Sequence, residues 1–222
     1  MPRTARVVVS RLPYHITQRG NRREKVFFRN KDYQEYLQWL HQYSREAALE
    51  VYAYCLMSNH IHIVAVPREA DSLVRALKPL HVRYAQWINR RRGWTGHLWQ
   101  ARFYSSVLDE NYLWTAVKYV ERNPVRAKLV RRAEEYRWSS AAAHCDRRTD
   151  SLLSPDLPLL AEIADWSEWL REGEDRETVD ILRRNTERGI PCGSEGFVNK
   201  LEKRLKRFLR FRPIGRPRRE SQ

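Results

Sequence analysis

The sequence is short of cysteine, of long apolar runs and of acidic residues, and each shortage excludes a class of protein. Its cysteines, Cys55, Cys145 and Cys192, are an odd number without a C-x-x-C pair, so they indicate neither a disulfide framework nor a zinc ribbon. No apolar run approaches the roughly 18 residues of a membrane span. The N-terminus also lacks the apolar core of a signal peptide. We therefore expect no membrane partner and a reducing, cytoplasmic location.

Acidic residues are few in comparison with basic residues. The chain of 222 residues carries 27 Asp and Glu against 42 Lys and Arg, a net charge of +15. Such a balance indicates a polyanionic partner, and without membrane signals nucleic acid is the better candidate. With 42% hydrophobic residues the chain is long enough to fold around a substantial core.

Hydrophobic periodicity predicts a mixed fold. Alternation of period two predicts strands, and spacing of three to four residues predicts helices. The expected order is strand 12–19, helix 32–49, strands 51–56 and 60–66, helix 71–92, strand or hairpin arm 97–108, and helix 110–122. This order is typical of an α+β ferredoxin-like sandwich, an antiparallel sheet with helices on one face.

Several residues predict where these elements begin, bend and end. Asp32 and Asp109 are expected to be helix N-caps. Pro79 predicts a kink or two consecutive helices, and Pro124 should stop the last helix near Asn123. The segment 57–59 is either a tight turn or part of one bent strand.

Strand signals disappear beyond residue 140. Helical spacing continues from about 161 to 188 and again from Ser194, and the last residues are basic with little apolar content. We therefore divide the chain into a domain at 1–145, a helical C-terminal extension at 146–210 and a flexible basic tail at 211–222.

One strand holds a candidate metal site. His60 and His62 stand two residues apart in an alternating run, so their side chains share one face of the predicted strand. Two imidazoles side by side can bind one metal ion. The alternative, one buried core histidine and one surface histidine, is equally consistent with such a short motif.

The predicted helix 110–122 offers a second half of that site. Tyr119 and Asn123 are four residues apart and lie on one helical face. From spacing alone, Tyr119 is better explained as a core residue and Asn123 as a helix terminator before proline.

Longer motifs favour a functional interpretation. The segment Asn59-His60-Ile61-His62-Ile63-Val64 resembles the His-hydrophobic-His signature of the HUH single-strand DNA nucleases, and Lys118 to Ala127 resembles the tyrosine helix of their one-tyrosine transposases. Nearly the whole chain resembles the REP-associated tyrosine transposases of bacteria. Further matching stretches are His15 to Arg23, Leu98 to Phe103, Trp138 to Ser140, and Phe197 to Leu201 with the Gly215 to Arg218 tail.

The resemblance implies a sequence-specific endonuclease and strand transferase that binds DNA hairpins and cuts single-stranded DNA beside them. It implies that Tyr119 is the nucleophile, forming a 5′-phosphotyrosine, and that His60 and His62 are metal ligands. Asn123 takes the place of the third ligand, which is a glutamine in some relatives. Histidine ligands alone would prefer zinc. The resemblance instead implies Mg²⁺ or Mn²⁺, no nucleotide cofactor, and a nucleoid-associated bacterial protein.

Basic residues interleaved with aromatics are candidates for DNA contacts, because such mixtures stack unpaired bases while tracking phosphate. The residues expected to bind DNA are Arg19, Arg22, Arg23, Arg90, Arg91, Arg92 and Arg102, with Arg216 and Arg218 in a tail similar to an AT-hook. Many of these arginines are equally explained as solvated surface.

Two other functions remain open on the sequence. The ferredoxin-like fold also serves non-catalytic single-strand nucleic-acid binding. The histidines could instead activate water in a metal-dependent nuclease that never forms a protein–DNA bond. The protein is expected to act as a monomer, with Tyr119 used in cis, or as a homodimer.

Overall fold

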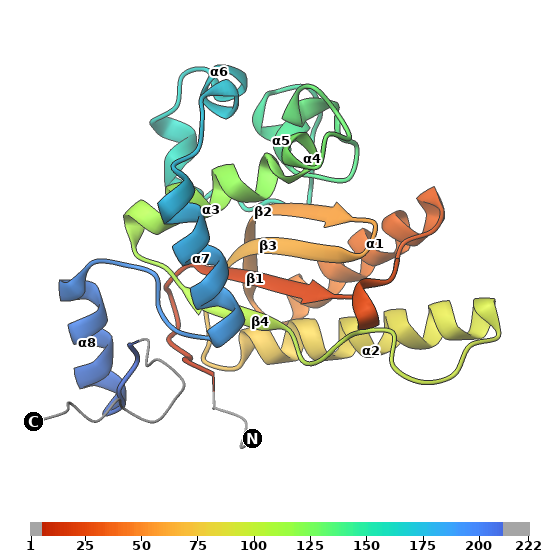
Figure 1. Ribbon diagram of the computed structural model, residues 1–222, viewed down its shortest axis with the longest axis horizontal. Helices are drawn as coiled ribbons and strands as arrows, with labels where there is room; N and C mark the ends of the chain where they lie inside the picture. The colour runs from red at the N-terminus through yellow and green to blue at the C-terminus, as the bar shows by residue number, and fades with distance from the viewer. Residues whose placement is uncertain (1–5, 211–222) are drawn as a thin grey trace, which may run out of the picture.

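A four-stranded antiparallel sheet is the centre of the protein. The computed structural model describes residues 6–210, apart from the side chains at positions 159 and 161. The strands are β1 (Tyr14–Arg19), β2 (Leu49–Met57), β3 (His60–Pro67) and β4 (Tyr104–Val107), in the spatial order β2-β3-β1-β4 (Figure 1). With the connections through α1 and α2, this order confirms the predicted ferredoxin-like α+β class.

The sheet separates two hydrophobic clusters. Ile61 and Ile63 point into the cluster beneath α1 (Asn30–Glu46) and α2 (Ser72–Arg92), the two helices of the ferredoxin-like unit. Val64 and Val66 point into the opposite cluster. The alternation predicted for β3 is therefore confirmed, and it places the even-numbered His60 and His62 on the second face.

Two helices cover that second face, one before and one after residue 145. They are α3 (Glu110–Glu121) and α7 (Arg176–Arg188), which pack against each other and against the sheet (Figure 1). The one-sided cover predicted from the sequence thus describes only α1 and α2. The apolar residues of α3, Leu113, Ala116, Val117 and Val120, fill the second cluster with Leu182 of α7.

The remaining elements are short, with one exception. They are η1 (Asn21–Arg23), α4 (Asn123–Arg126), η2 (Ala133–Glu135), α5 (Ala141–His144), η3 (Pro158–Ala161), α6 (Trp166–Arg171) and the longer α8 (Glu195–Leu205). Ser194 caps α8 by accepting the Phe197 amide, as the predicted start near Ser194 requires. No described helix is long and apolar enough to cross a membrane.

Of the outcomes predicted at Pro79, a division into two helices is wrong, and the prediction that Asp32 caps α1 is also wrong. Helix α2 runs unbroken through Pro79, because buried side chains on both sides of the proline, among them Leu77 and Leu80, anchor one continuous stripe. Asp32 is not the N-cap of α1 but its third residue, and its carboxylate accepts the amides of Phe28 and Arg29 at 2.8 and 3.0 Å. The aspartate still satisfies free amides before the helix, from a position inside it.

Both ends of α3 are as predicted, but a further short helix, α4, follows it directly. Asp109 caps α3 by accepting the Tyr112 amide at 3.0 Å, as predicted. The helix ends at Glu121, but Pro124 does not stop the helical path. It stands in the first turn of α4, where proline's missing N–H has no partner to lose.

The predicted strand 97–108 is mostly loop. Only Tyr104–Val107 forms β4. Trp99 turns inward, where its indole N–H donates to the His81 carbonyl of α2 at 3.1 Å. Its burial explains why an apolar, aromatic segment has the pattern of a strand without forming one. The segment 57–59, by contrast, is a tight turn, because β2 and β3 pair directly from Met57 and His60.

Candidate active site

His60 and His62 stand side by side on β3. Their ring centroids are 5.0 Å apart, with the planes nearly perpendicular. Burial, and then the positive charges of Arg19 and Arg126, lower the pKa of His60 to about 4. Burial also lowers the pKa of His62 well below its ordinary value, with the neighbouring histidines adding to the effect. Both rings are therefore neutral at pH 7, the form that binds metals.

The tight turn before β3 orients His60. His60 Nδ1 lies 2.6 Å from Asn59 Oδ1, and the Asn59 amide nitrogen donates to the Arg23 carbonyl at 2.9 Å. The Arg23 carbonyl can only accept, so the Asn59 oxygen faces His60 and Nδ1 must donate to it. The lone pair of His60 therefore lies on Nε2.

A third histidine contacts His62. His15 on β1 lies nearly coplanar with His62, with ring centroids 5.1 Å apart, and its Nε2 lies 2.9 Å from His62 Nδ1. Among the described residues, no hydrogen-bond partner is recorded for Nε2 of His60 or His62. Each imidazole thus has its Nδ1 bound to the protein and its Nε2 available.

Tyr119 lies against the histidines from α3. Its side chain is buried, and its ring packs edge-on against His62 and His15, with centroid distances of 5.3 and 5.6 Å. The phenol oxygen accepts a hydrogen bond from Arg183 Nε of α7 at 3.2 Å. Tyr119 is a buried core residue, as its spacing indicated. Its hydroxyl is hydrogen-bonded to a guanidinium, and its ring contacts His62, one of the two candidate ligands.

A second guanidinium lies over the tyrosine. Arg126 of α4 stands 4.1 Å from the Tyr119 ring centroid and donates to the Tyr119 carbonyl at 2.9 Å. Glu174 holds it through two contacts of 2.7 and 2.8 Å. Arg126 is therefore held over the Tyr119 ring with its charge balanced by Glu174.

The residues present fit a divalent ion only in part. Two neutral imidazoles offer two nitrogen donors, whereas no group of three His, Cys, Asp or Glu side chains within residues 6–210 is arranged to hold a metal. Asn123 opens α4, and its buried Nδ2 has no hydrogen-bond partner among the described residues. A metal ion binds an amide through its oxygen, so the unpartnered Nδ2 does not itself support Asn123 as a third ligand. The structure records no contact of the Asn123 side chain with either histidine.

Residues 8–123 match the family model of IS200-like transposases. The chain belongs to this family. The family resemblance carried by the histidine and tyrosine motifs is thereby confirmed, and membership implies DNA cleavage and rejoining. The matched residues contain His15, His60, His62, Tyr119 and Asn123.

One solved structure supports the fold of this transposase. The structure of the REP-associated tyrosine transposase bound to a REP hairpin is 18% identical, covering 71% of this chain and 93% of that one, with a TM-score of 0.54. A candidate transposase from Deinococcus radiodurans R1 is 19% identical, covering 55% of this chain and 97% of that one, with a TM-score of 0.37. A search of curated proteins found no match.

The arginines predicted to contact DNA fall in three places in the transposase. Arg19 of β1 lies opposite His60 of β3 in the strand register. Arg22 and Arg23 follow it in η1. Arg102 lines a cavity of about 620 Å³ next to Trp99. The third place is the end of α2. Arg216 and Arg218 lie outside the described residues.

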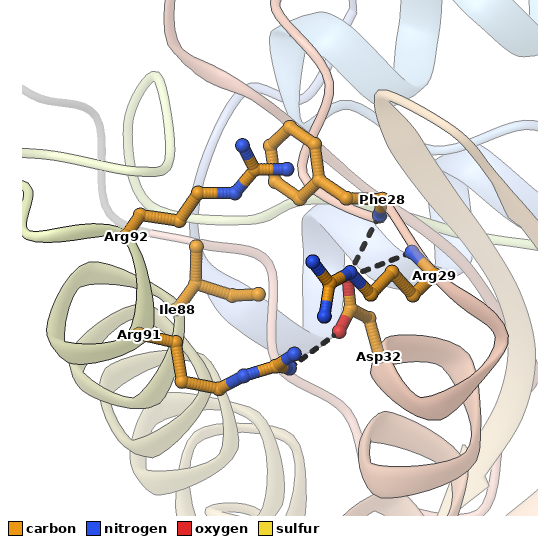
Figure 2. A pocket seen from close by; sticks show the side chains of 6 residues that line it. All are labelled: Phe28, Arg29, Asp32, Ile88, Arg91 and Arg92. Atoms are coloured by element: carbon orange, nitrogen blue, oxygen red, sulfur yellow. Dashed lines mark hydrogen bonds and ion pairs between the residues drawn. The ribbon is translucent and has the colours of Figure 1, made fainter.

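The end of α2 forms a pocket of about 360 Å³ (Figure 2). Arg91 is paired there with the buried Asp32 at 2.7 Å, so its charge is already balanced. Arg92 instead lies over the Phe28 ring at 3.6 Å and near the exposed Trp94 at 5.2 Å. Arg90 is exposed beside them. An arginine over one aromatic ring with a second ring beside it is the mixture expected of a single-strand binding surface.

Sequence reasoning missed four residues of the site. Arg183 and Thr186 lie near Tyr119 and His15 but carry no motif of their own, whereas Arg126 lies within the segment Lys118 to Ala127 without a role assigned to it. His15 could have been found, because alternation on β1 places it on one face of the predicted strand, as alternation places His62 on β3.

Proposed function

We propose that this transposase cuts and rejoins single-stranded DNA beside hairpins, with Tyr119 as the nucleophile and a 5′-phosphotyrosine as the intermediate. The observation that carries the proposal is the packing of the Tyr119 ring against His62, with the phenol oxygen bound to Arg183. The phenol oxygen forms the new bond to phosphorus, and the 3′-oxygen leaves as a hydroxyl. A second 3′-hydroxyl can reverse the step, so strands are joined without a nucleotide cofactor.

We further propose that His60 and His62 hold Mg²⁺ or Mn²⁺ through their Nε2 atoms, with Asn123 as third ligand. When bound, such an ion polarises the scissile phosphate. The protein's own contribution is positional: Asn59 and His15 fix the two imidazoles. Arg183 donates a hydrogen bond to the phenol oxygen, and Arg126 lies over the Tyr119 ring.

The domain division also stays a proposal, with a nuclease domain at 1–145, the helical extension at 146–210 and the basic tail at 211–222. Action as a monomer or a homodimer is likewise proposed. Hairpin DNA is the proposed substrate, supported by the REP hairpin bound to the structural relative.

The experiment that tests this function uses a pool of labelled hairpins with randomised single-stranded flanks, incubated with the full chain and Mn²⁺. A protein–DNA adduct that survives denaturation supports the phosphotyrosine. Cleavage without an adduct indicates a nuclease that activates water. Binding without cleavage, by a protein that binds Mn²⁺ normally, indicates a non-catalytic module. A pool avoids dependence on one arbitrary hairpin sequence.

The α2 pocket provides a prediction about DNA binding. Arg92→Gln is expected to weaken single-strand binding and to reduce the slope of log affinity against log salt by about 1, because one phosphate contact is lost. Arg75→Gln at the other end of α2 is the matched control, since Glu69 and Asp71 already pair with Arg75. Fluorescence anisotropy over a salt series measures both slopes. If the salt slopes of the two variants were equal, Arg92 would not be a DNA contact.

A further inference from the structure

The hydrogen bonds around His62 continue beyond the site into α7, which lies outside the residues 8–123 matched by the family model. His15 Nε2 is 2.9 Å from His62 Nδ1, and His15 Nδ1 is 2.8 Å from Thr186 Oγ1. The Thr186 hydroxyl donates to the Leu182 carbonyl at 2.7 Å. The exposed fractions of His15, His62 and Thr186 are 1%, 4% and 1%, so water does not compete for these bonds.

The hydrogen bond from Thr186 to Leu182 determines the direction of the other hydrogen bonds. A carbonyl only accepts, so Thr186 uses its one proton on Leu182 and must accept from His15 Nδ1. A buried, neutral imidazole carries a single N–H. With that proton on Nδ1, His15 Nε2 must accept, and His62 Nδ1 must donate to it. The free lone pair of His62 is therefore on Nε2.

We propose that Thr186 and His15 are positioning residues, which hold His62 in the tautomer whose Nε2 can bind a divalent ion. The inference rests on the proposed function for the use of His62 as a ligand, but the tautomer itself rests only on the contacts described. If the direction of these hydrogen bonds were reversed, His62 would carry its proton on Nε2, and that atom could not bind a metal ion.

The two candidate ligands are thus oriented by different parts of the protein. His60 is fixed by Asn59 and the Arg23 carbonyl, all within the family-matched residues. His62 is fixed through α7 of the C-terminal extension. The same helix, one turn earlier, donates from Arg183 to the Tyr119 hydroxyl. The extension is therefore part of the active site, because it contacts the nucleophile directly and one ligand through His15.

The experiment uses full-length, metal-free protein labelled with ¹⁵N-histidine, in which two-bond ¹H–¹⁵N correlations distinguish the tautomers. In wild type and Thr186→Ser, both His15 and His62 are expected to carry the proton on Nδ1. Thr186→Val removes the acceptor for His15 Nδ1. We then expect the hydrogen bond between the two histidines to reverse its direction, with His15 donating from Nε2 and His62 protonated on Nε2.

Titration with Mn²⁺ alone, followed by the electron paramagnetic resonance of the free ion, gives the second readout. Affinity should fall about 10- to 100-fold in Thr186→Val, the usual effect of losing a partner that orients a ligand, and recover in Thr186→Ser. Thr115→Val is the matched control, because Thr115 makes the same kind of bond to a carbonyl four residues earlier, at 3.2 Å, on α3. It should leave tautomers and affinity unchanged.

Two results overturn the inference: His62 protonated on Nε2 in the wild type, or Thr186→Val with unchanged tautomers and unchanged Mn²⁺ affinity. If Thr186→Val does not fold, the wild-type tautomers and those of Thr186→Ser decide the question. Failure of the proposed function looks different, because the tautomers would then be as stated while the wild type forms no covalent adduct with DNA.

Discussion

Tyr119→Phe is expected to lower DNA cleavage by at least about 10³-fold and to abolish the covalent adduct, because the variant lacks only the attacking oxygen. The ring and its packing against His62 and His15 remain. Single-strand affinity and Mn²⁺ affinity should therefore change little. Denaturing gels with labelled hairpin DNA measure the adduct, and single-turnover kinetics measure the rate.

Tyr112→Phe is the matched control for this variant. Tyr112 stands two turns earlier on the same helix and is only half-buried, at the edge of the same hydrophobic cluster. Its loss of a hydroxyl should leave cleavage at the wild-type rate. Cleavage by Tyr119→Phe at a rate near wild type would contradict the phosphotyrosine and favour activated water as the nucleophile.

The sequence predicted the part of the site that depends on local periodicity. Alternation placed His60 and His62 on one face of β3, and helical spacing placed Tyr119 on the buried side of α3. Both patterns are short-range, so neighbouring residues determine them. The ferredoxin-like order followed from the same patterns, because the number and sequence of elements allow few topologies.

The part supplied by α7 could not be predicted in this way. Arg183 is 64 residues from Tyr119, and Thr186 is 171 residues from His15. Such contacts depend on how an amphipathic helix docks on a sheet face, which its own spacing does not determine. The loop at 97–103 shows the converse error, since the burial of Trp99 produced an apolar pattern without a strand.

The carboxylate of Glu121 is the second place where α3 depends on distant residues. Glu121 is completely buried. It accepts hydrogen bonds from Ser140, from His144 Nδ1 at 2.7 Å and from Trp166 Nε1 at 2.7 Å. It therefore joins α3, two residues beyond Tyr119, to α5 and α6.

Glu121→Ala is expected to lower the free energy of unfolding by about 3–5 kcal/mol, because it leaves three buried polar partners without their acceptor. For a chain of this size, that is a fall in melting temperature of roughly 6–20 °C. Urea unfolding monitored by circular dichroism measures the change. Glu110→Ala, an exposed glutamate in the first turn of the same helix, should cost at most about 1 kcal/mol. Equal losses for both variants would mean that Glu121 does not hold α3 to the helices that follow it.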